Sequence, residues 1–166
     1  EALYLAALER NGDVLHMTSY APLLAKEKHT QWSPDLIYFN NREVKPTTGY
    51  CVQKLYGQNA GSHYIPSQII LDNQDNRVKL RIGSSIVRDS KTGDVIVKLV
   101  NLLPVSVETE IQLPGIGSVQ PSAVRTVLAG APESTPLPVT DTIEVGVNFK
   151  QQLPAYSFTV IRLKTK

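Results

Sequence analysis

The order of hydrophobic and polar residues divides the chain into a helical first part and a β-rich second part. Residues 1–10 are rich in Ala, Leu and Glu, and their wide apolar stripe predicts a helix that is buried on more than one side. Asn11-Gly12 predicts the end of this helix, because either residue accepts the left-handed C′ conformation. Residues 14–20 place apolar side chains close together with little alternation, which predicts a strand covered on both faces, as in a parallel sheet.

The remainder of the first part predicts a long polar loop, a short strand and a second helix. Residues 22–35 carry mixed charges and contain Trp32, the only tryptophan of the chain. Loops that leave the carboxyl ends of parallel strands carry the chemistry of many α/β proteins. Residues 36–39 form a short apolar run, and a threonine N-cap favours a helix over residues 47–57. Its packing face is expected to consist of two i,i+4 pairs, Cys51 with Leu55 and Val52 with Tyr56.

From Ile65 onward Val and Ile dominate, while Pro and Gly interrupt the sequence at short intervals. This pattern predicts about seven or eight strands and therefore a mainly β fold, an antiparallel sandwich with Greek-key or jelly-roll connections. Residues 72–76 and 91–94 predict turns. The strands are expected near residues 65–72, 77–88, 94–102, 105–113, 122–129, 140–149 and 155–164. Strict alternation places Val107, Thr109, Ile111 and Leu113 on one face of their strand.

The composition is that of one folded domain, or of one domain and a fragment of another. The chain has 166 residues, of which 42% are hydrophobic and 19% are charged. Its 17 basic and 15 acidic residues are scattered, so neither nucleic acid nor a membrane surface is an expected partner. No apolar stretch approaches the roughly eighteen residues of a transmembrane helix. The lone Cys51 cannot form an internal disulfide, and a chain that begins at Glu1 within a predicted helix is typical of a sequence cut from a longer one.

The residues that commonly bind metals or perform catalysis form no recognisable cluster. His16, His29 and His63 lack the spacing of a metal site, so we expect neither a metal nor a cofactor. His16 falls within the predicted buried strand and is expected to be a hydrogen-bonded core residue. The chain contains no nucleophile elbow, phosphate-binding loop or dinucleotide fingerprint.

Sugar chemistry remains open, because the loop at residues 22–35 carries an aromatic ring beside carboxylates. Retaining glycoside hydrolysis uses two carboxylates about 5 Å apart. Glu27 and Asp35 lie on this loop, but no pattern pairs them as acid and nucleophile, and a solvated surface role is favoured for Glu27. Trp32 beside Ser-Pro-Asp suits the apolar face of a sugar ring. The alternative is a tryptophan that plugs the end of a barrel, and the sequence favours neither.

Four stretches carry a resemblance to a known family: SYAPLLAKE, QWSPDLIYFNN, PTTGYCVQKLYGQNAG and LPAYSFTVIRL. Together they resemble the end of an α-L-arabinofuranosidase of glycoside hydrolase family 51, and the match covers essentially the whole chain. The first three stretches are specific to that family. The last is shared by sandwich domains of several related hydrolases.

The resemblance implies a (β/α)8 barrel followed by a C-terminal jelly-roll sandwich. Residues 1–60 would then be the last helices and the eighth strand of a truncated barrel, and residues 61–166 the sandwich. It also implies that terminal arabinofuranosyl groups are removed from arabinan and arabinoxylan with retention, by one glutamate as acid/base and another as nucleophile. Both glutamates would lie upstream of Glu1, so we expect no catalytic residue in this chain. The absence of any Asn-Glu pair agrees with this expectation.

Trp32 and Asp35 are the substrate-binding residues that the resemblance leaves within this chain. In another branch of the family, the corresponding loop reads Trp-Arg-Gln, and its glutamine helps to hold the sugar. Ser33-Pro34-Asp35 stands in that place here, so the glutamine contact is missing.

The functional hypothesis is the C-terminal part of an arabinofuranosidase, inactive by itself. Its partners would be an arabinose-containing polysaccharide or oligosaccharide and the rest of its own barrel. The alternative is a carbohydrate-binding module, although residues 65–166 offer only three aromatic side chains, Phe149, Tyr156 and Phe158. A structural role on the barrel is favoured for the sandwich. We expect the 47–57 helix to dock on the sandwich, the exposed 14–20 strand to support dimerisation, and the longer protein to be secreted or periplasmic rather than cytoplasmic.

Overall fold

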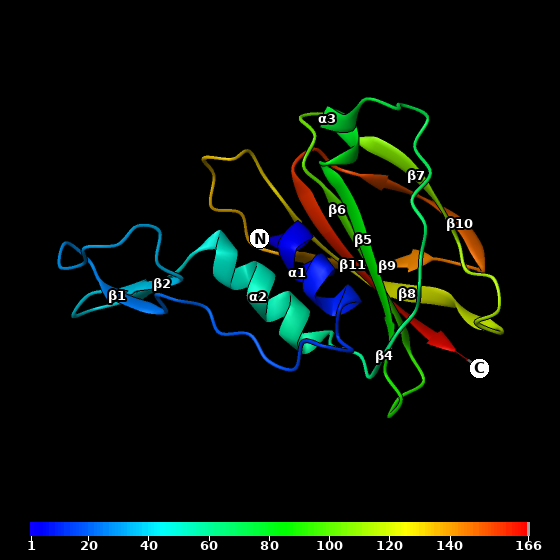
Figure 1. Ribbon diagram of the computed structural model, residues 1–166, viewed down its shortest axis with the longest axis horizontal. Coiled ribbons are helices and arrows are strands. Elements are labelled where there is room, and N and C mark those ends of the chain that lie inside the picture. Colours follow the sequence, from blue (N-terminus) through cyan, green and yellow to red (C-terminus); the bar gives the residue numbers. More distant parts are fainter. Residues whose placement is uncertain (166) are drawn as a thin grey trace.

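The computed structural model describes residues 1–165, which form a large β-sheet packed between a helix pair and a second sheet (Figure 1). The helices are α1 (Ala2–Arg10), α2 (Thr48–Gln58) and the short α3 (Asn76–Lys79). The strands are β1 (Leu24–Lys26), β2 (Ile37–Phe39), β3 (Val44–Pro46), β4 (His63–Tyr64), β5 (Ile82–Arg88), β6 (Val95–Asn101), β7 (Val107–Gln112), β8 (Val119–Ala129), β9 (Val139–Glu144), β10 (Asn148–Leu153) and β11 (Ser157–Thr165). The predicted class, mainly β with antiparallel sheets after a short helical part, is confirmed.

The large sheet has six strands in the order β4-β5-β6-β11-β8-β9, and each neighbouring pair is antiparallel. Its central strands β6 and β11 are buried along almost their whole length. Burial on both faces explains why their sequences, VIVKLVN and SFTVIRLKT, carry apolar residues at both parities. β7 and β10 cover one face of the sheet, and α1 and α2 cover the other (Figure 1).

Two hydrophobic clusters fill the spaces between these layers, and alternate residues of β6 enter different clusters. The cluster between the two sheets is built around Val95, Val97, Leu99, Ile111, Leu113, Ile116, Ala123, Leu153, Ile161 and Leu163. The cluster between the helices and the large sheet contains Ala2, Leu5, Ala6, Cys51, Val52, Leu55, Tyr56, Val87, Ile96, Val100, Leu128, Phe158 and Val160.

The predicted docking of the second helix on the sandwich is confirmed. All four residues of its expected packing face are buried in the cluster beneath the helices. The Tyr56 ring stacks on Phe158 of β11 with a centroid distance of 4.9 Å and an interplanar angle of 6°. The Tyr56 hydroxyl donates a hydrogen bond of 2.8 Å to the carbonyl oxygen of Ala2, which ties the two helices together.

A buried ion pair fastens α1 to the sheet. Lys98 of β6 is fully buried on the helix-facing side, and its Nζ lies 2.5 Å from Glu9 Oε1 and 5.1 Å from the ring centroid of Tyr56. Ser85 Oγ donates to the other oxygen, Glu9 Oε2. Burial lowers the pKa of Lys98, and the carboxylate of Glu9 opposes this shift. A charged Lys98 is therefore tolerated in the interior because Glu9 is beside it.

The predicted buried strand at residues 14–20 is absent, so this prediction was wrong. Val14 is 74% exposed and Met17 is 86% exposed, and His16 is exposed rather than a core residue. A strand buried on both faces needs neighbouring strands for its N–H and C=O groups. Within the described part of the chain, no strand pairs with this segment. The expected dimerisation was to occur through this strand. Without the strand, that expectation loses its structural basis.

Several predicted boundaries also differ from the structure. The loop at residues 22–35 contains β1, which pairs with β2 in parallel. Residues 65–72 hold no strand, since Pro66 lacks a ladder donor and Ile70 is 83% exposed. The Asp75 side chain caps α3, so the strand expected from residue 77 begins at Ile82. The strand expected at residues 140–149 is two strands, β9 and β10. The first helix ends as predicted, but Asn11 has a φ of −106°, outside the left-handed region.

Removal of the Glu9 carboxylate should destabilise the protein strongly. We expect Glu9→Ala to lower the free energy of unfolding in urea by about 3 kcal/mol, because it leaves the buried Lys98 ammonium without its partner. Glu108→Ala is the matched control, since Glu108 pairs with Lys150 at 3.0 Å on the surface, and it should leave stability nearly unchanged. Adding Lys98→Met to Glu9→Ala should recover most of the loss. Equal effects of Glu9→Ala and Glu108→Ala would contradict the proposed role of the pair.

Candidate functional site

The loop between β1 and β2 carries both residues that the sequence predicted to contact substrate. We call residues 27–36 the Trp32 loop. Because β1 and β2 are parallel, with Leu24 opposite Ile37, the loop returns from the end of β1 to the start of β2. β3 pairs with the other side of β2 and completes a small sheet. This sheet projects beyond the N-terminal end of α2, away from the large sheet (Figure 1). The fold therefore displays the Trp32 loop at an outer end of the molecule.

The two predicted site residues have opposite exposures. Trp32 is 68% exposed, whereas Asp35 is only 1% exposed. Trp32 therefore presents its ring to solvent and plugs no core formed by residues 1–165. Asp35 lies beneath the loop, so the two residues share a segment of chain but not a surface.

Thr30 connects these two residues through its hydroxyl group. Thr30 Oγ1 accepts a hydrogen bond of 3.1 Å from the Trp32 N–H. The same oxygen lies 3.2 Å from both the Trp32 carbonyl oxygen and Asp35 Oδ2, and it can donate its single hydrogen to one of them. The negative charge of the carboxylate favours Asp35 as the acceptor. The Asp35 N–H in turn donates to Tyr38 Oη at 2.9 Å.

The second carboxylate oxygen of Asp35 is also buried. Asp35 Oδ1 has no hydrogen-bond partner among residues 1–165. Burial without a donor is unfavourable for a carboxylate, which increases the importance of the bond from Thr30. Tyr20 lies near this carboxylate: burial raises the pKa of Tyr20, and the carboxylates of Glu1 and Asp35 add to the shift.

Glu27 has a structural role at the start of the Trp32 loop. Its carboxylate accepts hydrogen bonds of 2.8 Å from Lys45 Nζ and from Asn40 Nδ2. The Lys45 bond first, and then the Asn40 bond, lower the pKa of Glu27. Lys45 also pairs with Glu43 at 3.0 Å. The ionised Glu27 thus attaches the loop to the β2–β3 turn, in agreement with the surface role favoured for it.

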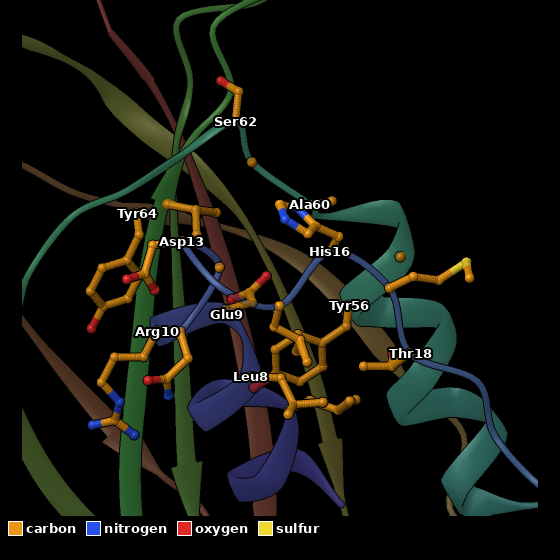
Figure 2. A pocket seen from close by; sticks show the side chains of 18 of the residues that line it. Leu8, Glu9, Arg10, Asp13, His16, Thr18, Tyr56, Ala60, Ser62 and Tyr64 are labelled. Carbon is orange, nitrogen blue, oxygen red and sulfur yellow. The ribbon is translucent and has the colours of Figure 1, made fainter.

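A separate cleft of about 940 Å³ lies between α1, α2 and residues 60–64 (Figure 2). Figure 2 shows Glu9 beside Tyr56 within the cleft and His16 on the wall that the segment after α1 forms. That wall belongs to the segment predicted as a buried strand.

Two carboxylates line this cleft, Glu9 and the exposed Asp13, and Glu9 is not free for acid or nucleophile chemistry. Glu9 binds Lys98 through one oxygen and Ser85 through the other. Within residues 1–165, no group of three or more His, Cys, Asp or Glu residues is placed to hold a metal ion. In the same described part of the chain, no helix has the length and apolar character needed to span a membrane.

Sequence reasoning missed Thr30 and Tyr38, which hold Asp35 and Trp32 in place. Thr30 had a usable signal, because a threonine hydroxyl in a loop often accepts the backbone N–H of the residue two positions later, which forms an ST-turn. Tyr38 had no such signal, since it lies within an apolar run that predicts only a strand.

Comparison with known proteins identifies relatives of the whole chain. Residues 1–157 match the family described as alpha-L-arabinofuranosidase C-terminal domain. An extracellular exo-alpha-L-arabinofuranosidase from Streptomyces chartreusis is 50% identical over 68 residues, which is 41% of this chain and 8% of that protein. A probable alpha-L-arabinofuranosidase A from Aspergillus terreus is 35% identical over 120 residues, or 71% of this chain and 18% of that protein. The chain therefore corresponds to a small fraction of the length of these relatives.

Solved structures agree with this relationship. The arabinose-bound α-L-arabinofuranosidase MgGH51 is 33% identical and superposes with a TM-score of 0.87 over 100% of this chain and 27% of its own. An α-L-arabinofuranosidase from Thermotoga petrophila, at 15% identity, superposes with a TM-score of 0.78 over 97% of this chain and 37% of its own. The second comparison supports the fold alone.

Because Trp32 is the only tryptophan, fluorescence excited at a wavelength that tyrosine does not absorb reports on this loop directly. We expect emission at the long wavelength of a water-exposed indole and acrylamide quenching close to that of a free tryptophan derivative, since the side chain is 68% exposed. Trp32→Phe is the control and should remove the signal. Blue-shifted emission that resists acrylamide would contradict the exposed placement of Trp32.

Proposed function

Because the chain belongs to the alpha-L-arabinofuranosidase C-terminal domain family, we propose that it is the C-terminal part of a longer glycoside hydrolase that releases terminal α-L-arabinofuranosyl groups. The observation that carries this proposal is the family match over residues 1–157. The names of the relatives and the arabinose bound to MgGH51 support the substrate class. Arabinan and arabinoxylan are the polysaccharides that we expect the longer enzyme to act on, with retention of configuration.

We assign no catalytic residue to this chain. Retention requires an acid/base and a nucleophile about 5 Å apart. Two carboxylates near the candidate sites are engaged in structural contacts: Glu9 with Lys98, and Glu27 with Lys45. In this proposal the catalytic pair lies in the barrel that precedes the chain, and the sandwich packs on that barrel and stabilises it.

Trp32 is the proposed contact between this chain and the sugar. Its exposure on a projecting loop supports this role, because an aromatic face can pack against the C–H groups of a sugar ring. Asp35 is only 1% exposed and lies beneath the loop, so its proposed contribution to sugar binding is indirect.

We further propose that residues 1–60 are the end of the barrel and residues 61–166 the sandwich domain. Residues 14–20 would become the eighth barrel strand once neighbouring strands satisfy their backbone groups. The exposure of Val14 and Met17 supports this assignment, because a longer protein can cover both side chains.

Two other hypotheses receive different support. An extracellular or periplasmic location is supported by the extracellular relative from Streptomyces chartreusis. A carbohydrate-binding role for the sandwich is not favoured, because Phe158 is 3% exposed and Phe149 and Tyr156 are only partly exposed. A binding platform requires aromatic faces that are open to the ligand.

The proposed function predicts that the 166-residue chain does not hydrolyse a 4-nitrophenyl α-L-arabinofuranoside, whereas the longer enzyme does. Within the longer enzyme, Trp32→Ala should lower kcat/KM by about tenfold, the loss expected for one aromatic contact. Leu137→Ala is the control, since Leu137 is 75% exposed on the sandwich and should not affect turnover. Turnover by purified chain would contradict the upstream location of the catalytic pair, and an unchanged kcat/KM would exclude Trp32 from the sugar site.

Hydrogen exchange tests the proposed barrel boundary. Amides of residues 14–20 should exchange rapidly in this chain and far more slowly in the longer enzyme, because they gain ladder partners there. Amides of β6 provide an internal control, since they should be protected in both proteins. Equally rapid exchange of residues 14–20 in the longer enzyme would refute the assignment as a barrel strand.

A further inference from the structure

Three hydrogen bonds link Trp32 to the end of its loop that leads into β2. We call them the Thr30 clip: the Trp32 N–H donates to Thr30 Oγ1, the Thr30 hydroxyl faces Asp35 Oδ2, and the Asp35 N–H donates to Tyr38 Oη. The clip encloses the Ser33-Pro34 turn that follows Trp32. It therefore holds the backbone of Trp32 and of the turn that follows it.

The residue that follows Asp35 is hydrogen-bonded to the N-terminal end of α2. The Leu36 N–H donates to the Pro22 carbonyl oxygen at 3.2 Å. The Leu36 carbonyl oxygen accepts two hydrogen bonds from Thr47, one from its N–H at 3.1 Å and one from its hydroxyl at 2.8 Å. Thr47 is also the N-cap of α2, where its hydroxyl accepts from the Tyr50 N–H at 3.3 Å. The residue after Asp35 is therefore held by the same threonine that begins the docked helix.

We propose that Thr30 and Asp35 are positioning residues that hold the Trp32 ring ready for an arabinofuranosyl ring, an inference that rests on the proposed function. Neither residue needs to touch the sugar. A ring held in place before binding loses less conformational freedom when the ligand arrives, which strengthens binding without a new contact.

The burial of Asp35 explains why the clip uses a carboxylate. Water does not reach Asp35 Oδ2, so the Thr30 hydroxyl is the donor that the structure provides for it. Because Thr30 itself is exposed, a neutral acceptor in solvent would compete poorly with water for this hydroxyl. A buried anion avoids that competition and holds Thr30, and through Thr30 the backbone of Trp32.

The first experiment needs no sugar, because steady-state fluorescence anisotropy, excited at a wavelength that tyrosine does not absorb, reports the nanosecond mobility of Trp32 alone. Thr30→Val keeps the shape of the side chain and removes the hydroxyl, so the anisotropy should fall toward that of the urea-unfolded chain. Thr30→Ser restores a hydroxyl and should restore the anisotropy. Asp35→Ala should act like Thr30→Val, whereas Asp35→Asn keeps an acceptor oxygen without the negative charge and should give an intermediate value.

Thr126→Val is the matched control. Thr126 bonds Thr140 at 2.9 Å on the sandwich, so its loss removes an equivalent exposed hydroxyl pair far along the chain from Trp32. Circular dichroism and urea midpoints confirm that each variant is folded. An unchanged anisotropy in folded Thr30→Val would overturn the clip.

The second experiment measures the consequence for the sugar in the longer enzyme, with 4-nitrophenyl α-L-arabinofuranoside as the probe. Thr30→Val should raise KM by about two- to tenfold, with a smaller change in kcat, and Thr30→Ser should reverse the effect. A fall in anisotropy without a change in KM would overturn the positioning role. If Trp32→Ala also leaves KM unchanged, the failure lies with Trp32 as a sugar contact, whereas an altered KM in Trp32→Ala alone places it with the clip.

Discussion

The ion pair between Lys98 and Glu9 is the constraint on which the layered arrangement depends. Lys98 points from the centre of the large sheet into the helix layer, where its ammonium has no access to water. A charge in that position requires an opposite charge within contact distance, and Glu9 of α1 supplies it. Tyr56 lies against Lys98 and stacks on Phe158, so the same region also fixes α2. The pair thus determines where both helices lie, and apolar packing stabilises the result.

That arrangement extends to the Trp32 loop through a continuous set of contacts. α2 is anchored on the sheet by Tyr56 at its C-terminal half, and its N-terminal end is capped by Thr47. Thr47 holds Leu36, and the adjacent Asp35 holds Thr30. A sandwich with few exposed aromatic side chains can therefore contribute to a sugar site indirectly, by fixing the segment that displays Trp32. The stabilising role proposed for the sandwich and the binding role proposed for the loop would be two consequences of the same packing.

Elements whose partners lie within the chain were predictable from the sequence. The i,i+4 pattern of α2 and the alternation of residues 107–113 each report one buried face, and the structure supplies that face. The pattern of residues 14–20 reports burial too, but the neighbours that would cover it are not among residues 1–165. The apolar pattern of this segment therefore indicates neighbouring strands that residues 1–165 do not provide. In the candidate site, Trp32 and Asp35 were found through their chemistry, whereas their opposite exposures depend on Thr30 and Tyr38, whose contacts are set by loop geometry.

The proposed division at residue 60 would follow topology rather than stability. The cluster beneath the helices takes Leu5, Val52 and Tyr56 from one side of that boundary and Ile96 and Phe158 from the other. Without the helices, the outer face of the large sheet would expose this apolar surface to water, and that exposure opposes folding. The sheet and the two helices are therefore one cooperative unit, although one helix pair completes a barrel in the longer protein that we propose. In the longer protein that we propose, a barrel whose last helices are buried in the following domain could not move independently of that domain, so the sugar site and the sandwich would be mechanically a single body.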